Sequence, residues 1–296
     1  MDRLDAMSVL LRAVETGSLS GASRSLGMPL ATVSRKISDL EAHLGTRLLI
    51  RTTRSLALTE AGAAYLTAAR RILAEVAEAE RAAAGEFDIP SGELVVTAPL
   101  LFGRLHILPV VMDFLAAYPK IGVRMPLSDR NLHLVDEHVD IAARIGALPD
   151  SGMIATRVGG MRTVVCASPD LLAAHGAPQE PSDLTELPCV NFEPFSIRPV
   201  WRFPREDVAI RSRLSVSTAE VAVAAAVRGF GAVRVLHYQC AEAVRDGSLR
   251  IILSDFEPAP QPVHLLHAAR GVLPLKMRAF LDFVAPRLRE RLASIG

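Results

Sequence analysis

The sequence contains few aromatic residues and few cysteines, and its charges nearly cancel. Aromatics make up 5% of the 296 residues, so a core must be built from Leu, Val, Ile and Ala. The three cysteines, Cys166, Cys189 and Cys240, form no CxxC pair and have no histidine at zinc-ligand spacing. This pattern predicts buried, unreactive thiols in a reducing compartment rather than a metal site.

Long apolar runs are absent as well. No stretch of about 18 consecutive apolar residues occurs, and the first residues, MDRLDAMSVLLRAVETGS, lack the apolar core of a signal peptide. We therefore expect a cytoplasmic protein without a membrane partner. With 50% hydrophobic and 22% charged residues, the chain suffices for two or three folded domains.

Catalytic motifs are also missing. The sequence has no GxSxG, GxxxxGK[ST] or HExxH motif, and its eight histidines are scattered without a carboxylate at zinc-site spacing. His106 lies in an apolar helical segment and is expected to be a hydrogen-bonded core residue. An enzyme on a doubly wound sheet would need a nucleophile–base set or a cofactor loop. We therefore predict a protein that is not an enzyme and holds no cofactor or metal.

The net charge of +1 conceals a local excess of positive charge. Between Ser20 and Arg54 there are two acidic residues and six basic ones, which are Arg24, Arg35, Lys36, Arg47, Arg51 and Arg54. A basic patch on a neutral protein is typical of one DNA-binding module, although a solvated helix face gives the same count.

Helical periodicity in the same region predicts a helix-turn-helix. Apolar residues recur at helical spacing over residues 3–16 and again from Val33 to Leu44, and a short helix between them ends at Gly27. Two short helices joined by a tight turn form this motif. The last helix would then present Leu30, Ala31, Ser34 and Arg35 outward, and Arg35 fits either a guanine or a phosphate.

Residues 47–58, RLLIRTTRSLAL, are two apolar runs around a polar tip, Arg51-Thr52-Thr53-Arg54. This is a β-hairpin pattern. A plain surface hairpin would look the same, but its position directly after a helix-turn-helix favours a DNA-contacting wing.

A long helix follows, with Thr59 as its expected N-cap. Apolar residues repeat along it in a heptad pattern, at Tyr65, Ala69, Ile72, Val76, Ala79 and Ala83. Such a seam is typical of a helix packed on a partner helix. It predicts a dimer that offers two recognition helices to the half-sites of a partly symmetric operator.

From about residue 91 the pattern becomes α/β. A Gly- and Pro-containing hinge at residues 82–93 leads into alternating strands and helices, which predict a largely parallel sheet in each of two lobes. Lobe I is expected at about 91–161 and 266–296, and lobe II at about 162–265. A small molecule would bind between them, at the carboxyl ends of the strands.

Two strand-to-helix junctions, at Thr97 to Leu100 and at Ser217-Thr218, offer N–H groups and hydroxyls that suit an anion such as a carboxylate. Arg144, at the end of a strand, would add a positive charge. Ser217 and Thr218 are equally well explained as ordinary N-caps. A solute-binding component is the alternative, but it predicts a signal peptide and no basic helix-turn-helix.

The block AVETGSLSGASRSLG, followed by VSRKISDLEAHLGTRLLIRTTRSLALTEAG, resembles the DNA-binding half of the LysR-type transcriptional regulators. The segments TAPLLFGRLHILPVV, VDIAARIGALPDS and RVGGMRTVVCASPDLL resemble the effector-binding domain of the same bacterial family. The resemblance implies a winged helix-turn-helix at residues 1–58, a linker and dimerisation helix with hinge at 59–90, and an α/β type 2 periplasmic-binding-protein-like domain of two lobes at 91–296.

The resemblance also implies site residues. The matching DNA-binding positions are Pro29, Leu30, Thr32, Ser34, Arg35, Lys36, Thr53 and Arg54. The matching effector-binding positions are Thr97, Pro99, Leu100, Phe102, Arg144, Ser217, Thr218 and Phe230.

One departure from the family pattern is Met28-Pro29-Leu30, where many relatives have an apolar residue, then Ser, then Pro or Gln. It removes the usual Ser N-cap. The family further implies promoter DNA, a small-molecule effector, RNA polymerase and tetramers built from two dimers as partners.

Overall fold

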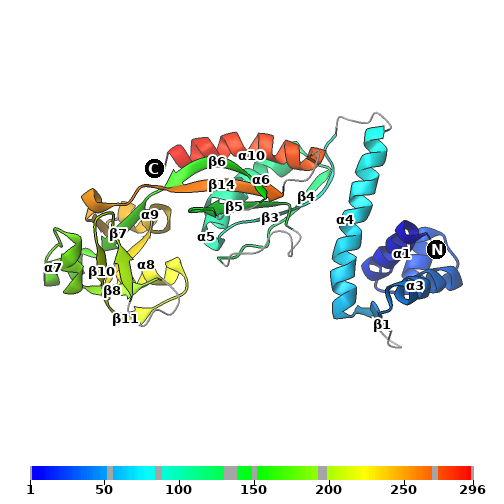
Figure 1. Cartoon of the computed structure of the whole chain (residues 1–296), viewed down its shortest axis with the longest axis horizontal. Helices are drawn as coiled ribbons and strands as arrows, with labels where there is room; N and C mark the ends of the chain where they lie inside the picture. The colour runs from blue at the N-terminus through cyan, green and yellow to red at the C-terminus, as the bar shows by residue number, and fades with distance from the viewer. Residues whose placement is uncertain are drawn as a thin grey trace. The chain divides into compact units, whose positions relative to one another are not determined.

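The computed structural model describes residues 2–51, 56–83, 89–129, 139–148, 152–192, 199–268 and 273–294. The chain divides into a first unit, Met1–Gly92, and a second unit, Glu93–Gly296 (Figure 1).

The first unit is helical with one small hairpin. Its elements are α1 (Arg3–Glu15), α2 (Leu19–Leu26), α3 (Leu30–Leu44), β1 (Leu49–Arg51), β2 (Leu56–Leu58) and α4 (Glu60–Ala83). β1 and β2 pair antiparallel with Leu49 opposite Leu58. The predicted hairpin after a helix-turn-helix is therefore confirmed.

Local hydrogen bonds mark the ends of these helices, and two of the ends, at Gly27 and Thr59, are those that the sequence predicts. The Ser18 hydroxyl accepts the N–H of Gly21, and the Thr59 hydroxyl accepts the N–H of Gly62. Gly27 ends α2 and Gly45 ends α3, both in the left-handed conformation that glycine adopts without steric cost. Gly62 has a different role, because a Cβ atom there would lie 2.0 Å from the Leu48 carbonyl oxygen.

Lobe I of the second unit is a five-stranded sheet in the order β4-β3-β5-β14-β6. The strands are β3 (Gly92–Thr97), β4 (Ile121–Arg124), β5 (Ile141–Ile145), β6 (Met153–Met161) and β14 (Gln261–Ala268). Two helical segments pack in this lobe. One is continuous and consists of α5 (Leu100–Phe102), a π-helical turn (Gly103–Ile107) and α6 (Leu108–Ala117). The other is α10 (Leu275–Ala293), which lies along β6 (Figure 1).

The segment Leu100–Ala117 is long and apolar enough to span a membrane. Its Phe102, Ile107, Val110 and Phe114 are buried in the core of lobe I together with Phe280 of α10. In this structure the segment is a core helix.

Lobe II is a second five-stranded sheet, in the order β11-β8-β12-β7-β13. Its strands are β7 (Thr163–Ala167), β8 (Pro188–Asn191), β11 (Arg211–Ser215), β12 (Ala232–Leu236) and β13 (Arg250–Ile252). The lobe also contains α7 (Pro169–His175), α8 (Ala219–Val227), α9 (His237–Arg245), the hairpin of β9 (Val200–Arg202) with β10 (Asp207–Ala209), and two short 3-10 helices, Pro181–Thr185 and Ser254–Phe256.

The expectation of largely parallel sheets is wrong. β3 and β5 are parallel, but β14 runs antiparallel to both β5 and β6, and β7 runs antiparallel to β12 and β13. The reason is that the chain crosses between the lobes twice. After each crossing, the first strand of the sheet it enters, β7 in lobe II and β14 in lobe I, runs against the parallel strands there, whereas β6 keeps the direction of β3 and β5. Because β14 lies wholly in the first sheet, lobe II ends before Gln261 rather than near residue 265.

An ion pair joins the two crossings. Arg162 lies between β6 and β7, and Glu257 lies on the return segment before β14. The Arg162 guanidinium donates from Nε and from one terminal nitrogen to the two carboxylate oxygens of Glu257, at 2.9 and 2.8 Å. The hydrogen bonds to Glu257 raise the pKa of Arg162. This bidentate, partly buried pair holds the crossing segments side by side.

Replacing Arg162 by Met should therefore destabilise the second unit by about 1.5–3 kcal/mol, because Glu257 would keep its charge without its partner. Unfolding in urea can be followed through the fluorescence of the single tryptophan, Trp201, which lies in this unit. Arg211 is the control, since its pair with Glu186 spans 3.7 Å with side chains 72% and 85% exposed. Arg211→Met should change stability by less than about 1 kcal/mol, and an equal loss in both variants would contradict the assigned role.

Candidate functional site

The inner face of α3 determines which of its side chains point outward. Val33, Ile37 and Leu40 are fully buried, in one cluster with Leu10 of α1 and Ala22 of α2. On the opposite side of the helix, three of the four side chains predicted to face outward are exposed, which are Leu30, Ala31 and Arg35. The fourth, Ser34, is half-buried.

Pro29 is the N-cap residue of α3 and supplies no side-chain capping bond, as its lack of a polar group requires. Pro29 is exposed, and Leu30 is 48% exposed, which is high for a leucine. Thr32 is half-buried next to them. The helix thus begins with an apolar, solvent-facing end, a surface suited to contact the methyl group of a thymine.

Lys36 forms an ion pair with Asp5 of α1. Both side chains are about 30% exposed, at 27% and 30%. A DNA phosphate would have to compete with Asp5 for this ammonium group. Sequence reasoning did not foresee this contact, because the partner lies 31 residues away in the chain.

Glu41 places the wing relative to α3. One oxygen of its carboxylate accepts the N–H groups of both Leu48 and Leu49, at 2.8 and 3.0 Å. The start of β1 is therefore bonded to α3, the helix predicted to enter the DNA groove. In the sequence, the only indication of this contact was that Glu41 is an acidic residue within a basic block. Of the predicted wing residues, Thr53 and Arg54 lie outside the described residues.

The predicted seam of α4 is divided between two environments. Ala69 is fully buried, and Tyr65 packs against the core of its own unit, because the first half of α4 lies on α1. Burial raises the pKa of Tyr65. Ile72 and Val76 are only half-buried within one chain. Of the residues at heptad spacing, Tyr65 and Ala69 thus pack within the chain, whereas Ile72 and Val76 keep part of their surface exposed.

Two of the predicted effector positions are core residues of lobe I. Thr97 is fully buried and its hydroxyl donates to the carbonyl of Pro126 at 2.6 Å. Phe102 is fully buried as well. Both side chains therefore lie in the core under the β3–α5 junction and do not face solvent.

The helix beginning at Leu100 already has a carboxylate at its N-terminus. The Leu100 N–H donates to one oxygen of Asp129 at 2.9 Å, and the Ser128 N–H donates to the carbonyl of Ala98. Pro99, half-buried, is the N-cap residue, and the side chain of Leu100 is 44% exposed. Sequence reasoning missed Asp129, because the segment after β4 has no periodicity that places it beside this junction.

The remaining predicted effector positions are accessible. Ser217 and Phe230 are exposed, while Thr218 and Arg144 are half-buried. Thr218 is the N-cap of α8, yet its side chain makes no capping hydrogen bond. Arg144 lies near the carboxyl end of β5, which runs parallel to β3, and it donates to the carbonyl of Ala143.

Three rings pack together where the lobes meet. Tyr238 of α9, in lobe II, lies with its ring centre 5.6 Å from that of Phe102 and 5.4 Å from that of His106, both of lobe I. Burial raises the pKa of Tyr238, and the negative charges of Asp129 and Glu220 raise it further. The sequence placed Tyr238 only on a helix, because this contact joins residues of different lobes.

His106 is buried, as predicted, but it is not hydrogen-bonded. It is 5% exposed, and neither ring nitrogen has a partner among the described residues. Burial, and to a lesser extent the positive charge of the nearby Arg291 guanidinium, lowers the pKa of His106 to about 4. The ring is therefore neutral at pH 7.

This pKa makes the second unit acid-sensitive. The unfolded chain protonates His106 near pH 6.5 and the folded chain only near pH 4, so between these values the unfolded state binds more protons. Stability should fall as the pH drops below 6.5, by up to about 1.4 kcal/mol per pH unit.

Urea unfolding followed by Trp201 fluorescence from pH 7 to pH 4.5 measures this effect. His106→Leu should flatten the pH dependence, whereas His175→Leu, at an exposed histidine, should not. An unchanged slope in His106→Leu would exclude His106 as its source.

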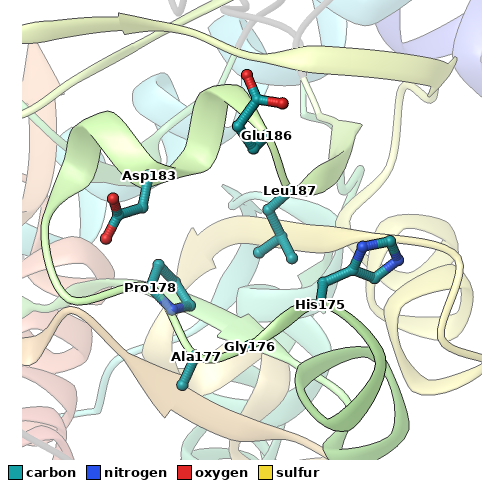
Figure 2. Close-up of a pocket in the computed structure, with 7 residues that line it drawn as sticks. All are labelled: His175, Gly176, Ala177, Pro178, Asp183, Glu186 and Leu187. Carbon is teal, nitrogen blue, oxygen red and sulfur yellow. The ribbon is translucent and has the colours of Figure 1, made fainter.

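A pocket of about 320 Å³ lies elsewhere on lobe II (Figure 2). It is lined by His175, Gly176, Ala177, Pro178, Asp183, Glu186 and Leu187. None of these is a predicted effector position. The carboxylate of Asp183 already accepts the N–H groups of Gln179 and Glu180. In the described part of the chain, no three His, Cys, Asp or Glu side chains gather as metal ligands would.

The fold and the exposed helix α3 define a DNA-binding transcription regulator with a separate substrate-binding domain. Residues 4–63 match the family model of the bacterial regulatory helix-turn-helix proteins of the lysR family, and residues 88–289 match that of the LysR substrate binding domain. The chain belongs to the LysR family of transcriptional regulators.

Individual relatives agree along nearly the whole chain. An HTH-type transcriptional repressor of Pseudomonas aeruginosa is 34% identical, covering 98% of this chain and 93% of the relative. The structure of CrgA, a LysR-type regulator from Neisseria meningitidis, matches with a TM-score of 0.60 and 32% identity over 96% of this chain and 98% of CrgA. The full-length virulence activator AphB of Vibrio cholerae matches with a TM-score of 0.58 and 28% identity, over 95% and 98% of the two chains.

Proposed function

We propose that this regulator binds a partly symmetric promoter site as a dimer, and that a small-molecule effector bound between lobes I and II modulates its use of that site. It acts in the cytoplasm on the nucleoid, contacts RNA polymerase and has no catalytic activity. The observation that carries the proposal is the exposed side of α3, which lies opposite the buried Val33, Ile37 and Leu40.

The DNA-binding surface consists of the outward residues of α3 and the wing. The proposed contacts are Pro29, Leu30, Thr32, Ser34, Arg35, Lys36, Thr53 and Arg54. Leu30 and Arg35 are supported by their exposure at the N-terminal part of the helix, the part that enters a major groove. The bonds of Glu41 to the β1 backbone support a wing that moves together with α3.

The effector site lies around the β3–α5 and β11–α8 junctions. The proposed effector contacts are Pro99, Leu100, Arg144, Ser217, Thr218 and Phe230. Thr97 and Phe102 are fully buried, so we assign them to the core that supports these contacts. Closing the lobes around an effector would change the geometry of each subunit and hence the spacing of the DNA-binding units in a tetramer.

Gel-shift and footprinting experiments with the upstream intergenic DNA, with and without a panel of metabolites, test this function. We expect binding that weakens as salt rises and a footprint that changes with at least one compound. Absence of salt-sensitive binding to any duplex would contradict the DNA-binding role. Binding without any ligand-dependent change in the footprint would contradict effector sensing.

Arg35 provides a sharper test of the DNA surface. If its guanidinium pairs with a guanine, Arg35→Ala should weaken specific binding by about 1–3 kcal/mol, and Arg35→Lys should lose most of the same specificity because an ammonium lacks the bidentate fork. Fluorescence anisotropy with the operator and with mutated operators measures both. A uniform loss on all sequences, restored by Lys, would show a phosphate contact instead.

The dimer interface is tested on the half of α4 that does not pack on α1. Ile72→Glu with Val76→Glu should convert dimers to monomers, since two carboxylates would be buried in each paired helix. Sedimentation velocity measures the change. Arg70→Glu, at an exposed position of the same helix, is the control, and a double variant that sediments like the parent protein would refute pairing through this surface.

A further inference from the structure

Lys36 lies on the flank of α3, between the buried side of the helix and its outward side. Ile37, the next residue, is fully buried, and Arg35, the residue before, is exposed. Successive residues of a helix are about 100° apart around its axis, so a half-buried Lys36 between these two lies at the edge of the outward side. A helix in the major groove directs its centre to base edges, and its flanks lie nearer the phosphates of the two strands. The position of Lys36 therefore suits a phosphate contact.

The folded chain already supplies an anion for this ammonium group. Lys36 is paired with the carboxylate of Asp5, in the first turn of α1. The side chain of the preceding N-cap residue, Asp2, accepts the N–H groups of Leu4 and Asp5. The end of α1 that reaches α3 thus carries two carboxylates, and one of them neutralises a cation of the proposed DNA surface.

Breaking the Lys36–Asp5 pair costs little free energy. The two side chains are 27% and 30% exposed, and ion pairs with this much solvent access are weak. A carboxylate in the first turn of a helix is also stabilised by the partial positive charge of that helix end, so Asp5 does not depend on Lys36 alone. The flexible stem of a lysine lets its ammonium group turn to another anion. Lys36 can therefore leave Asp5 when a phosphate approaches.

We propose that Lys36 exchanges Asp5 for a DNA phosphate when the regulator binds, so that Asp5 competes with the duplex and lowers the affinity for DNA of any sequence. This inference rests on the proposed function, in which Lys36 is a DNA contact. Phosphate contacts position a protein on the duplex but carry no sequence information. The competition by Asp5 therefore acts equally on the operator and on unrelated DNA. It limits how tightly the protein binds and leaves the choice of sequence to other residues.

Asp5→Asn tests the competition directly, because the amide keeps the size of the side chain and loses its charge. We expect the full-length dimer to bind both its operator and an unrelated duplex of the same length about 2- to 30-fold more tightly, the range that corresponds to two weak ion pairs. Fluorescence anisotropy over a range of salt concentrations measures the affinities. A gain in affinity cannot arise from a variant that fails to fold.

Lys36→Met completes a double-mutant cycle. Alone, it should weaken binding to both duplexes and make the dependence of log affinity on log salt less steep by about 0.9 per subunit, because one phosphate contact is lost. In the Lys36→Met background, Asp5→Asn should lose most of its gain, since the freed cation is absent. Glu60→Gln is the matched control, because Glu60 is an exposed carboxylate in the first turn of α4. Its effect on affinity should be the same with and without Lys36.

Unchanged or weaker DNA binding by Asp5→Asn would overturn the proposal, as would a gain that persists in full without Lys36. A gain confined to the operator would overturn it too, because it would show that Lys36 reads a base. A salt dependence that Lys36→Met leaves unchanged would exclude the phosphate contact. Absence of salt-sensitive binding by the parent protein would instead contradict the proposed function itself.

Discussion

The burial of one face of α3 is the constraint on which the DNA-binding unit depends. Val33, Ile37 and Leu40 have no exposed surface, and such side chains stabilise the unit only if the helix keeps this one rotation about its axis. Leu30 and Arg35 face solvent as a consequence of this packing. The bonds from Glu41 to the first residues of the wing extend the same constraint beyond the helix. The outward face of α3, on which the proposed DNA contacts lie, thus follows from the packing behind it.

In the second unit the constraint is topological. Each lobe completes its sheet with strands that arrive from the other lobe, and the Arg162–Glu257 pair holds the two crossings together. The two crossings and this ion pair therefore join one lobe to the other. The Phe102, His106 and Tyr238 rings pack together where the two lobes meet.

Local features were predictable where a short stretch of chain supplies both the element and its end. The helix ends at Gly27 and Thr59 and the hairpin of β1 and β2 follow from adjacent residues. The heptad seam shows the limit of such reasoning. Its spacing identifies one face of α4, but Tyr65 and Ala69 on that face pack on the same chain, and periodicity does not distinguish a partner's helix from a neighbouring one.

The sequence by itself determined the family, the order of the two units and the outward residues of the recognition helix, because these depend on local periodicity and on turn chemistry. Only the tertiary structure decided the strand directions, the engagement of Lys36 by Asp5, and the approach of Asp129 to Leu100. The physical reason is the same in each case. These contacts join residues far apart in the chain, and their free energy depends on distances that exist only after the units have folded.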